Sequence, residues 1–167
     1  SFVEIVILGD LLHLAEWSDR FLRSPDMFMT TQPAIVEAAW YLAQLRAKCE
    51  KVYLLEGNHE KRLRDLLVKH MYQAYQLKPA DNLDASPVMS VPNLLGLESL
   101  DVQYVGDYPN GEVWITDDLA CKHGHRASGK SGRTVSSVVD EIDYSVVFGH
   151  IHRIEMASRT THGKKGP

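Results

Sequence analysis

Three short apolar segments of this chain each end at a glycine that is followed by metal-binding or acid–base residues. The segments are residues 2–8 before Gly9-Asp10, residues 52–55 before Gly57-Asn58-His59-Glu60, and residues 146–148 before Gly149-His150-Ile151-His152. Short β-branched runs are typical of buried strands in an α/β sheet. Such sheets bind their ligands just beyond the carboxyl ends of the strands. The pattern therefore favours a fold that brings these polar ends to one edge.

A fourth polar cluster, His123-Gly124-His125, follows the short segment 119–121. Only a metal or a highly charged substrate gives so many polar groups a reason to converge. The residues expected at this common edge are Asp10, Asn58, His59, His123, His150 and His152.

The rest of the chain alternates between strand-like and helix-like segments. The expected strands are residues 2–8, 51–55, 102–105, 112–116, 119–122, 144–148 and 153–158. The expected helices are residues 31–48, with Pro33 in the first turn, 60–75, 93–100 and 132–142. Pro109-Asn110-Gly111 indicates a hairpin that joins the third and fourth strands. This alternation predicts an α/β sandwich with a mixed sheet.

Composition places the chain among ordinary globular domains. A length of 167 residues suits one domain with its own core, and 44% hydrophobic and 24% charged residues are usual for a soluble protein. No apolar run approaches the roughly 18 residues of a membrane span, and no secretory signal is visible. Cys49 and Cys121 have no paired spacing, which favours a reducing compartment. We therefore expect a cytoplasmic location and no membrane association.

The net charge of −4 argues against bulk electrostatic attraction to nucleic acid, although a local basic patch would still bind it. The chain starts at Ser1, one residue before a strand, and ends in loop-like sequence. Residues 1–167 are accordingly expected to form a single domain that is incomplete at both ends.

The polar residues have the types that phosphate-ester hydrolysis needs. Two divalent ions about 3.5–4 Å apart neutralise phosphate oxygens and activate a bound water as hydroxide. Asp10 offers a bridging carboxylate, and Asn58 offers a neutral amide oxygen. His123, His150 and His152 offer imidazoles. His59, next to Asn58, can protonate the leaving oxygen or stabilise charge on phosphorus.

Taken in order, Gly9-Asp10, Gly57-Asn58-His59-Glu60, His123-Gly124 and Gly149-His150-Ile151-His152 resemble the motifs of the calcineurin-like metallophosphoesterase superfamily. The combination is specific, whereas each motif alone is weak. The resemblance implies a metallophosphoesterase-type β sandwich of mixed sheets, flanked by helices and carrying two metal ions, with manganese, iron or zinc as candidates.

The same resemblance implies roles for individual residues. Asp10 would bridge the two ions, and Asn58, His123 and His150 would complete the shell of the second metal. His152 would bind the first metal, and His59 would be the catalytic acid–base residue. The implied activity is a hydrolase of phosphate mono- or diesters. The short chain is similar to small bacterial and phage-type members, which favours a phosphodiesterase or nuclease with nucleic acid or nucleotide as partner.

One motif of the family, Asp-x-His, lies upstream of Gly-Asp and is not found in residues 1–8. This departure suggests that the chain lacks the family's first strand and holds at most one metal well. An alternative is therefore a catalytically silent binding or scaffold module with an incomplete metal site.

A competing motif covers residues 124–131, which match the phosphate-binding pattern G-x-x-x-x-G-K-[ST]. A P-loop nucleotide hydrolase also needs a later strand that ends in Asp, whereas the later strand here ends in Gly149-His150. Only 36 residues follow Ser131, so this alternative is remote. Within the same segment, His125 and Arg126 are candidates for substrate binding, and a structural salt bridge is the other interpretation of Arg126.

Overall fold

The computed structural model describes residues 2–18 and 25–159 of the chain. The strands are β1 (Phe2–Ile7), β2 (Cys49–Leu55), β3 (Gln103–Val105), β4 (Glu112–Thr116), β5 (Leu119–Lys122) and β6 (Ser145–Phe148). The α-helices are α1 (Phe28–Arg46), α2 (Lys61–His70), α3 (Val91–Leu95) and α4 (Arg133–Glu141). Three short 3₁₀ turns are η1 (Ala15–Trp17), η2 (Pro25–Met27) and η3 (Tyr72–Ala74).

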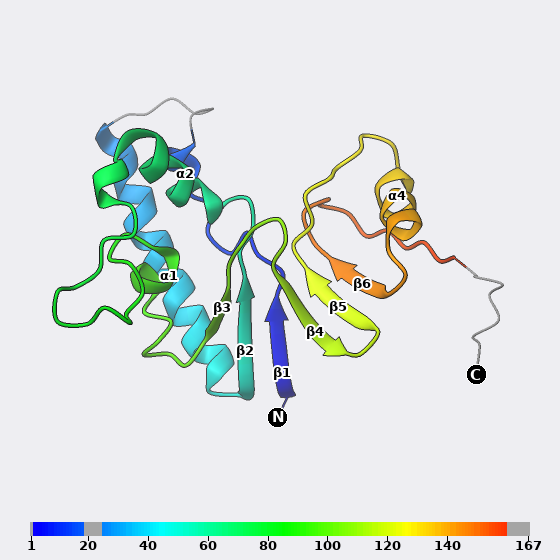
Figure 1. The fold of residues 1–167 in the computed structure, drawn as a ribbon, viewed down its shortest axis with the longest axis horizontal. Helices are drawn as coiled ribbons and strands as arrows, with labels where there is room; N and C mark the ends of the chain where they lie inside the picture. Colours follow the sequence, from blue (N-terminus) through cyan, green and yellow to red (C-terminus); the bar gives the residue numbers. More distant parts are fainter. Residues whose placement is uncertain (1, 19–24, 160–167) are drawn as a thin grey trace.

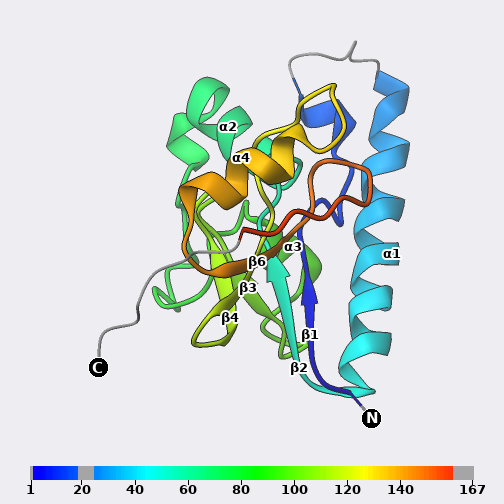
Figure 2. The ribbon, with the colours of Figure 1, turned by 90° about the vertical axis from the view of Figure 1, so that its right-hand side faces the viewer.

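The strands form two three-stranded sheets, ordered β1-β2-β3 and β4-β5-β6. The first sheet is parallel throughout, whereas β5 pairs antiparallel with β4 and parallel with β6. Helix α1 runs alongside the first sheet, and α4 lies beside the second (Figure 1). Figure 2, seen from the α4 side, shows α4 in front of the strands. The predicted α/β sandwich flanked by helices is confirmed.

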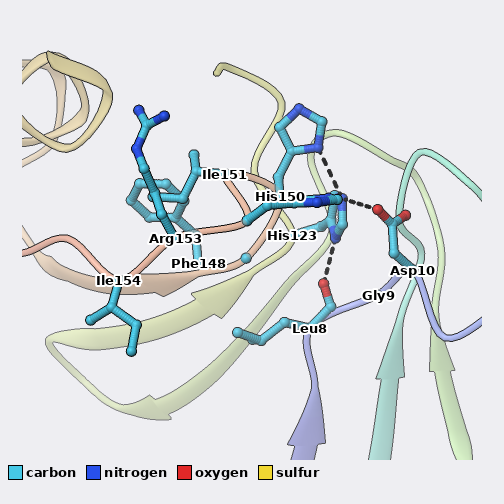
Figure 3. A pocket seen from close by; sticks show the side chains of 11 residues that line it. Leu8, Gly9, Asp10, His123, Phe148, His150, Ile151, Arg153 and Ile154 are labelled. Carbon is cyan, nitrogen blue, oxygen red and sulfur yellow. Dashed lines mark hydrogen bonds and ion pairs between the residues drawn. The ribbon is translucent and has the colours of Figure 1, made fainter. Parts of the chain in front are cut away.

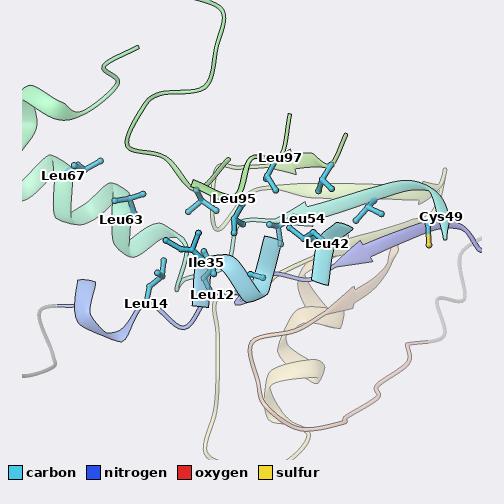
Figure 4. Close-up of a cluster of buried hydrophobic side chains, with 14 residues drawn as sticks. Leu12, Leu14, Ile35, Leu42, Cys49, Leu54, Leu63, Leu67, Leu95 and Leu97 are labelled. Atoms are coloured by element: carbon cyan, nitrogen blue, oxygen red, sulfur yellow. The ribbon is translucent and has the colours of Figure 1, made fainter. Parts of the chain in front are cut away.

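Side chains along β1 and β2 alternate between two hydrophobic clusters, one on each face of the first sheet. Val52 and Leu54 point into the main core, where they meet Leu42 of α1 (Figure 4). Tyr53 and Leu55 belong to the smaller cluster between the two sheets. Because neighbouring strand residues face opposite sides, the part of a strand that is buried on both faces is apolar at consecutive positions, as residues 52–55 are in β2.

The cluster between the sheets consists of buried residues from three strands, Leu55, Val113 and Cys121. Partly buried Val6, Leu8, Tyr53 and Val105 pack against it. This contact fixes the first sheet against the second, so the carboxyl ends of β1, β2, β5 and β6 reach the same region. The polar residues that follow these strands therefore meet. Cys49 and Cys121 are both buried and have free thiols.

The predicted hairpin between the third and fourth strands is wrong. β3 pairs with β2 in the first sheet, whereas β4 pairs with β5 in the second. The true hairpin joins β4 to β5 through Asp117 and Asp118, where Thr116 Oγ1 donates to Asp118 Oδ1. Pro109-Asn110-Gly111 instead lies in a link between sheets, because β3 finds its partner in the more deeply buried β2.

Several predicted boundaries also differ from the structure. α1 begins at Phe28, so Pro33 lies inside the helix and not in its first turn. α2 ends at His70, five residues early, because Met71 leaves helical geometry and is half exposed. α3 spans Val91–Leu95 in place of residues 93–100, since Gly96 ends it in a left-handed conformation. The predicted strand 153–158 does not form.

The helices that the structure describes in residues 25–159 are too short or too polar to cross a membrane. The cytoplasmic location remains a prediction.

Replacing Leu42 with Ala should lower the free energy of unfolding by about 2–5 kcal/mol. Leu42 is fully buried where α1 meets the first sheet, so the truncation leaves a cavity. Urea denaturation measures the change. Val36→Ala is the control, since Val36 lies on the same helix but is 59% exposed. An equal effect of the two substitutions would contradict this placement of the core.

Candidate metal centre

The end of β1 approaches the end of β2 so closely that only glycine fits at Gly9. Its φ of +89° lies in the left-handed region. A Cβ at this position would lie 2.7 Å from His123 Nδ1 and 2.8 Å from Gly57 Cα. Gly9 therefore lets the chain turn and delivers Asp10 beside the β2 end.

A buried carboxylate holds the two strand ends together. Glu60 is 1% exposed and accepts three backbone hydrogen bonds, each 2.9 Å long. The donors are the amides of Asp10, Leu12 and Gly57, so the contacts span both ends. Burial raises the pKa of the Glu60 carboxyl, and the backbone hydrogen bonds oppose that rise. Glu60 thus fixes the loops on which Asp10 and Asn58 lie.

His123 follows β5 and is almost fully buried at 3% exposed. Its Nδ1 lies 2.5 Å from the carbonyl oxygen of Leu8, which can only accept a hydrogen bond. The Nδ1 atom therefore carries the proton, and Nε2 of the neutral ring presents a lone pair. A metal-binding imidazole is usually oriented in this way, with its other ring N–H donating to a backbone carbonyl or a carboxylate.

The Nε2 lone pair of His123 points into a group of other acceptors (Figure 3). The Nε2 atom lies 3.1 Å from Asn58 Oδ1, 3.4 Å from Asp10 Oδ2 and 3.3 Å from His150 Nδ1. His150 Nδ1 is in turn 2.8 Å from Asn58 Oδ1. Four potential ligand atoms from four strand ends therefore lie close together.

This arrangement fits a divalent cation. Ligands held about 2.1 Å from one ion lie about 3.0–3.4 Å from each other in octahedral or tetrahedral geometry. The separations of 2.8–3.4 Å match that spacing. Asp10, His123 and His150 form the one cluster of histidine, cysteine and acidic ligands that the described residues bring together. These four atoms are mostly hydrogen-bond acceptors, with too few protons among them for each to bond to a neighbour. A bound cation would satisfy their lone pairs.

His59 lies at the edge of this centre and is held by Asp10. The His59 amide donates to Asp10 Oδ1 at 2.9 Å, and His59 Nε2 lies 3.8 Å from Asp10 Oδ2. Burial lowers the pKa of the His59 imidazole, with a smaller opposing effect from Asp10. The ring of His13 packs edge-on against it, with centroids 5.1 Å apart.

The other predicted site residues lie further out. Residues 8–10, His123 and residues 148–154 line a hollow at the centre (Figure 3). His152 is one of these lining residues but is exposed. His125 is also exposed. Arg126 forms an ion pair with Glu141 of α4 and a 3.4 Å hydrogen bond with Ser137 Oγ. Substrate binding by His125 and Arg126 stays a prediction.

The sequence of the chain matches the family model for calcineurin-like phosphoesterases over residues 3–153. The chain belongs to the calcineurin-like phosphoesterase family. The family binds divalent metals and hydrolyses phosphate esters, which agrees with the four ligand atoms at one point. Neither the search of curated proteins nor the search of solved structures gave a match.

Family membership displaces the P-loop interpretation of residues 124–131, because the match includes that segment. The loop has its own internal structure in this phosphoesterase. The Ser128 amide donates to Thr134 Oγ1 at 2.9 Å, and Ser128 Oγ accepts from the Lys130 amide at 3.2 Å. The β6 strand that follows α4 ends at Phe148 and is followed by Gly149-His150, without the acidic residue that a P-loop enzyme requires.

Sequence reasoning assigned no role to Glu60 or Tyr108 in this calcineurin-like phosphoesterase. Glu60 was visible as the acidic residue that ends the Gly57–Glu60 motif, so its position carried a signal. Tyr108 carried none, yet its ring packs on His123 with centroids 5.7 Å apart. The Tyr108 amide donates to buried Glu56, which also pairs with Arg64 at 3.3 Å.

Replacing Glu60 with Gln should destabilise the phosphoesterase by about 1–3 kcal/mol. The Gln amide nitrogen cannot accept a hydrogen bond, so at least one of the three backbone amides would lose its partner. Urea denaturation of the metal-free protein measures the effect, and Glu37→Gln on the exposed side of α1 is the matched control. Equal stability of the two variants would show that Glu60 does not hold the strand ends.

Proposed function

We propose that this protein is a divalent-metal-dependent phosphodiesterase, with nucleic acid or a nucleotide as its substrate class. The convergence of Asp10, Asn58, His123 and His150 on one point is the observation that supports this proposal most strongly. Manganese, iron and zinc all suit a donor set that combines a carboxylate, an amide oxygen and imidazoles.

Asp10 Oδ2, Asn58 Oδ1, His123 Nε2 and His150 Nδ1 would hold the ion. His152 lines the same hollow and is the candidate for a further imidazole ligand. A bound divalent ion supplies Lewis-acid polarisation of the phosphoryl oxygens and neutralises their charge. The protein contributes the fixed ligand geometry, because Glu60 and the Leu8 carbonyl hold Asp10 and His123 in place before any ion binds.

His59 is the residue suited to proton transfer at the leaving oxygen. Asp10 orients it through the His59 amide, and the lowered pKa keeps the imidazole neutral at pH 7 when no substrate is bound. An anionic phosphate next to the ring would favour the protonated form. The Nε2 atom would then donate its proton to the departing oxygen.

The charges around the hollow favour a phosphodiester over a monoester. A monoester carries nearly two negative charges at pH 7, whereas a diester carries one. Among the described residues that line the hollow, Arg153 is the one arginine or lysine, and its guanidinium is engaged by Glu155. The centre therefore offers little cationic side-chain charge beyond what a metal supplies, which suits the less charged ester.

Hydrolysis of bis-p-nitrophenyl phosphate in the presence of Mn²⁺ tests the proposed activity. The wild type should cleave this diester faster than p-nitrophenyl phosphate. His59→Ala should lower kcat by about 10²–10⁴-fold, since a positioned acid contributes that much. His70→Ala, at the exposed end of α2, is the control and should retain the wild-type rate. No cleavage with Mn²⁺, Fe²⁺ or Zn²⁺ would favour the silent binding module.

The pH dependence of metal binding should reflect the low pKa of His150. Burial lowers that pKa, with a further lowering from His123. The ring therefore stays neutral, and able to bind a metal, at more acidic pH than an ordinary histidine with a pKa of about 6.5. Calorimetric titration with Mn²⁺ between pH 5 and 8 should show the affinity persisting through pH 6.5 and falling below it. A midpoint above pH 6.5 would contradict this expectation.

A further inference from the structure

The loop after β6 holds two metal-ligand candidates in an unfavourable backbone conformation. His150 has a φ of 67° and His152 a φ of 54°, both in the left-handed region that non-glycine residues rarely adopt. Within this turn, the Ile151 amide donates to the Gly149 carbonyl oxygen at 2.8 Å. Such strain persists only where surrounding contacts over-determine the conformation. The loop therefore needs anchors outside itself.

Arg153, directly after His152, provides the first anchor. Its Nη2 donates to the carbonyl oxygen of Ser128 at 2.7 Å and lies 3.4 Å from that of Lys130. Its Nε donates to Glu155 Oε1 at 2.6 Å. The planar guanidinium makes these contacts through two different nitrogens held in a rigid fork, whereas a lysine offers donors on a single nitrogen. Arg153 thus ties the histidine loop to the segment before α4.

Glu155 provides the second anchor, at the beginning of α4. Its side chain is only 5% exposed, and Oε1 accepts from the Gly132 amide at 2.7 Å. Gly132 is the N-cap of α4 and has a φ of 75°. A carboxylate at a helix N-terminus is favourable because it meets free amides and the positive end of the helix dipole. That hydrogen bond and Arg153 lower the pKa of the Glu155 carboxyl.

We propose that Arg153 and Glu155 are positioning residues that hold His150 and His152 in ligand geometry by fastening their loop to residues 128–132. The inference rests on the proposed metal function of His150 and His152. It also gives residues 128–132 a role, since the Gly/Ser-rich loop supplies the carbonyls and the amide that the Arg153–Glu155 pair binds. Residues 153–158 form no strand, and Arg153 and Glu155 within this segment make these contacts.

A different role for Arg153 would be direct contact with the substrate phosphate, since Arg153 lines the hollow. Three hydrogen bonds to protein atoms already use its guanidinium. Figure 3 shows the Arg153 side chain directed away from Asp10 and His123. The two roles differ in what they change: positioning alters metal affinity, whereas phosphate contact alters KM.

Calorimetric titration with Mn²⁺ tests the proposal on Arg153→Ala, Glu155→Ala and Glu155→Gln. Loss of partners that orient metal ligands typically costs about 10–100-fold in affinity, and the two alanine variants should show such a loss. Glu155→Gln should lose less, because it keeps an oxygen acceptor for the Gly132 amide. Arg159→Ala is the matched control, since Arg159 also donates to carbonyls, those of Asp140 and Ile142, but at the other end of α4. Unchanged Mn²⁺ affinity in the alanine variants would overturn the proposal, and a raised KM alone would assign Arg153 to the substrate.

Amide hydrogen exchange of the metal-free protein separates this inference from the proposed function. Arg153→Ala and Glu155→Ala should speed exchange of the Ile151 amide while the amide of Leu54 in β2 keeps its wild-type rate. Absence of Mn²⁺ binding by the wild type would reject the proposed function, and the exchange result would still decide whether the pair holds the loop. Unchanged exchange at Ile151 would overturn the inference whether or not the wild type binds metal.

Discussion

The carboxylate of Glu60 accepts hydrogen bonds from both ends of the parallel β1–β2 pair, and the geometry of the centre depends on it. A fully buried carboxylate is costly unless its oxygens are satisfied. Here the amides of Asp10, Leu12 and Gly57 satisfy them, so the loops after the two strands must stay together. The same contacts place Asp10 beside the His59 amide. One buried charge thus orients a metal-ligand candidate and the proposed acid.

The second sheet completes the centre through an independent constraint. Packing of Leu55 against Val113 and Cys121 brings the end of β5 to the end of β1. His123 Nδ1 then donates to the Leu8 carbonyl oxygen, which favours the tautomer with its proton on Nδ1 and a lone pair at Nε2. Hydrophobic contact between the sheets therefore determines the tautomer of a buried imidazole. The ligand geometry follows from packing and hydrogen bonding and needs no metal to assemble it.

Much of this arrangement could be predicted, because the signals were local. The apolar runs located β1, β2 and β6 within one or two residues, and the ranges of β4 and β5 matched the structure. The candidate ligands that follow strands converge because parallel β1 and β2 end at one edge of the first sheet, parallel β5 and β6 end at one edge of the second, and the two sheets pack together. Asp10, Asn58, His123 and His150 were predicted on that ground and do converge, whereas His152 lies on the rim of the hollow.

The errors arose where distant parts of the chain decide the outcome. Pro109-Asn110-Gly111 is a valid local turn signal, but β3 pairs with β2 and β4 pairs with β5. The apolar face of α2 predicted a helix that continues to residue 75. The helix ends at His70 instead, because Met71 is half exposed and does not pack in the core. The packing of Tyr108 on His123 depends on Glu56, 52 residues earlier in the chain, and no sequence pattern indicates that contact.

The central claim is that four strand ends form one preorganised cation site. A crystal of the protein grown with Mn²⁺ and measured with anomalous scattering tests it most directly. The account predicts an anomalous peak about 2.0–2.4 Å from Asp10 Oδ2, Asn58 Oδ1, His123 Nε2 and His150 Nδ1, with the Leu8 carbonyl still bonded to His123. A fully loaded crystal with its Mn²⁺ elsewhere, or with no anomalous peak among these atoms, would contradict the account.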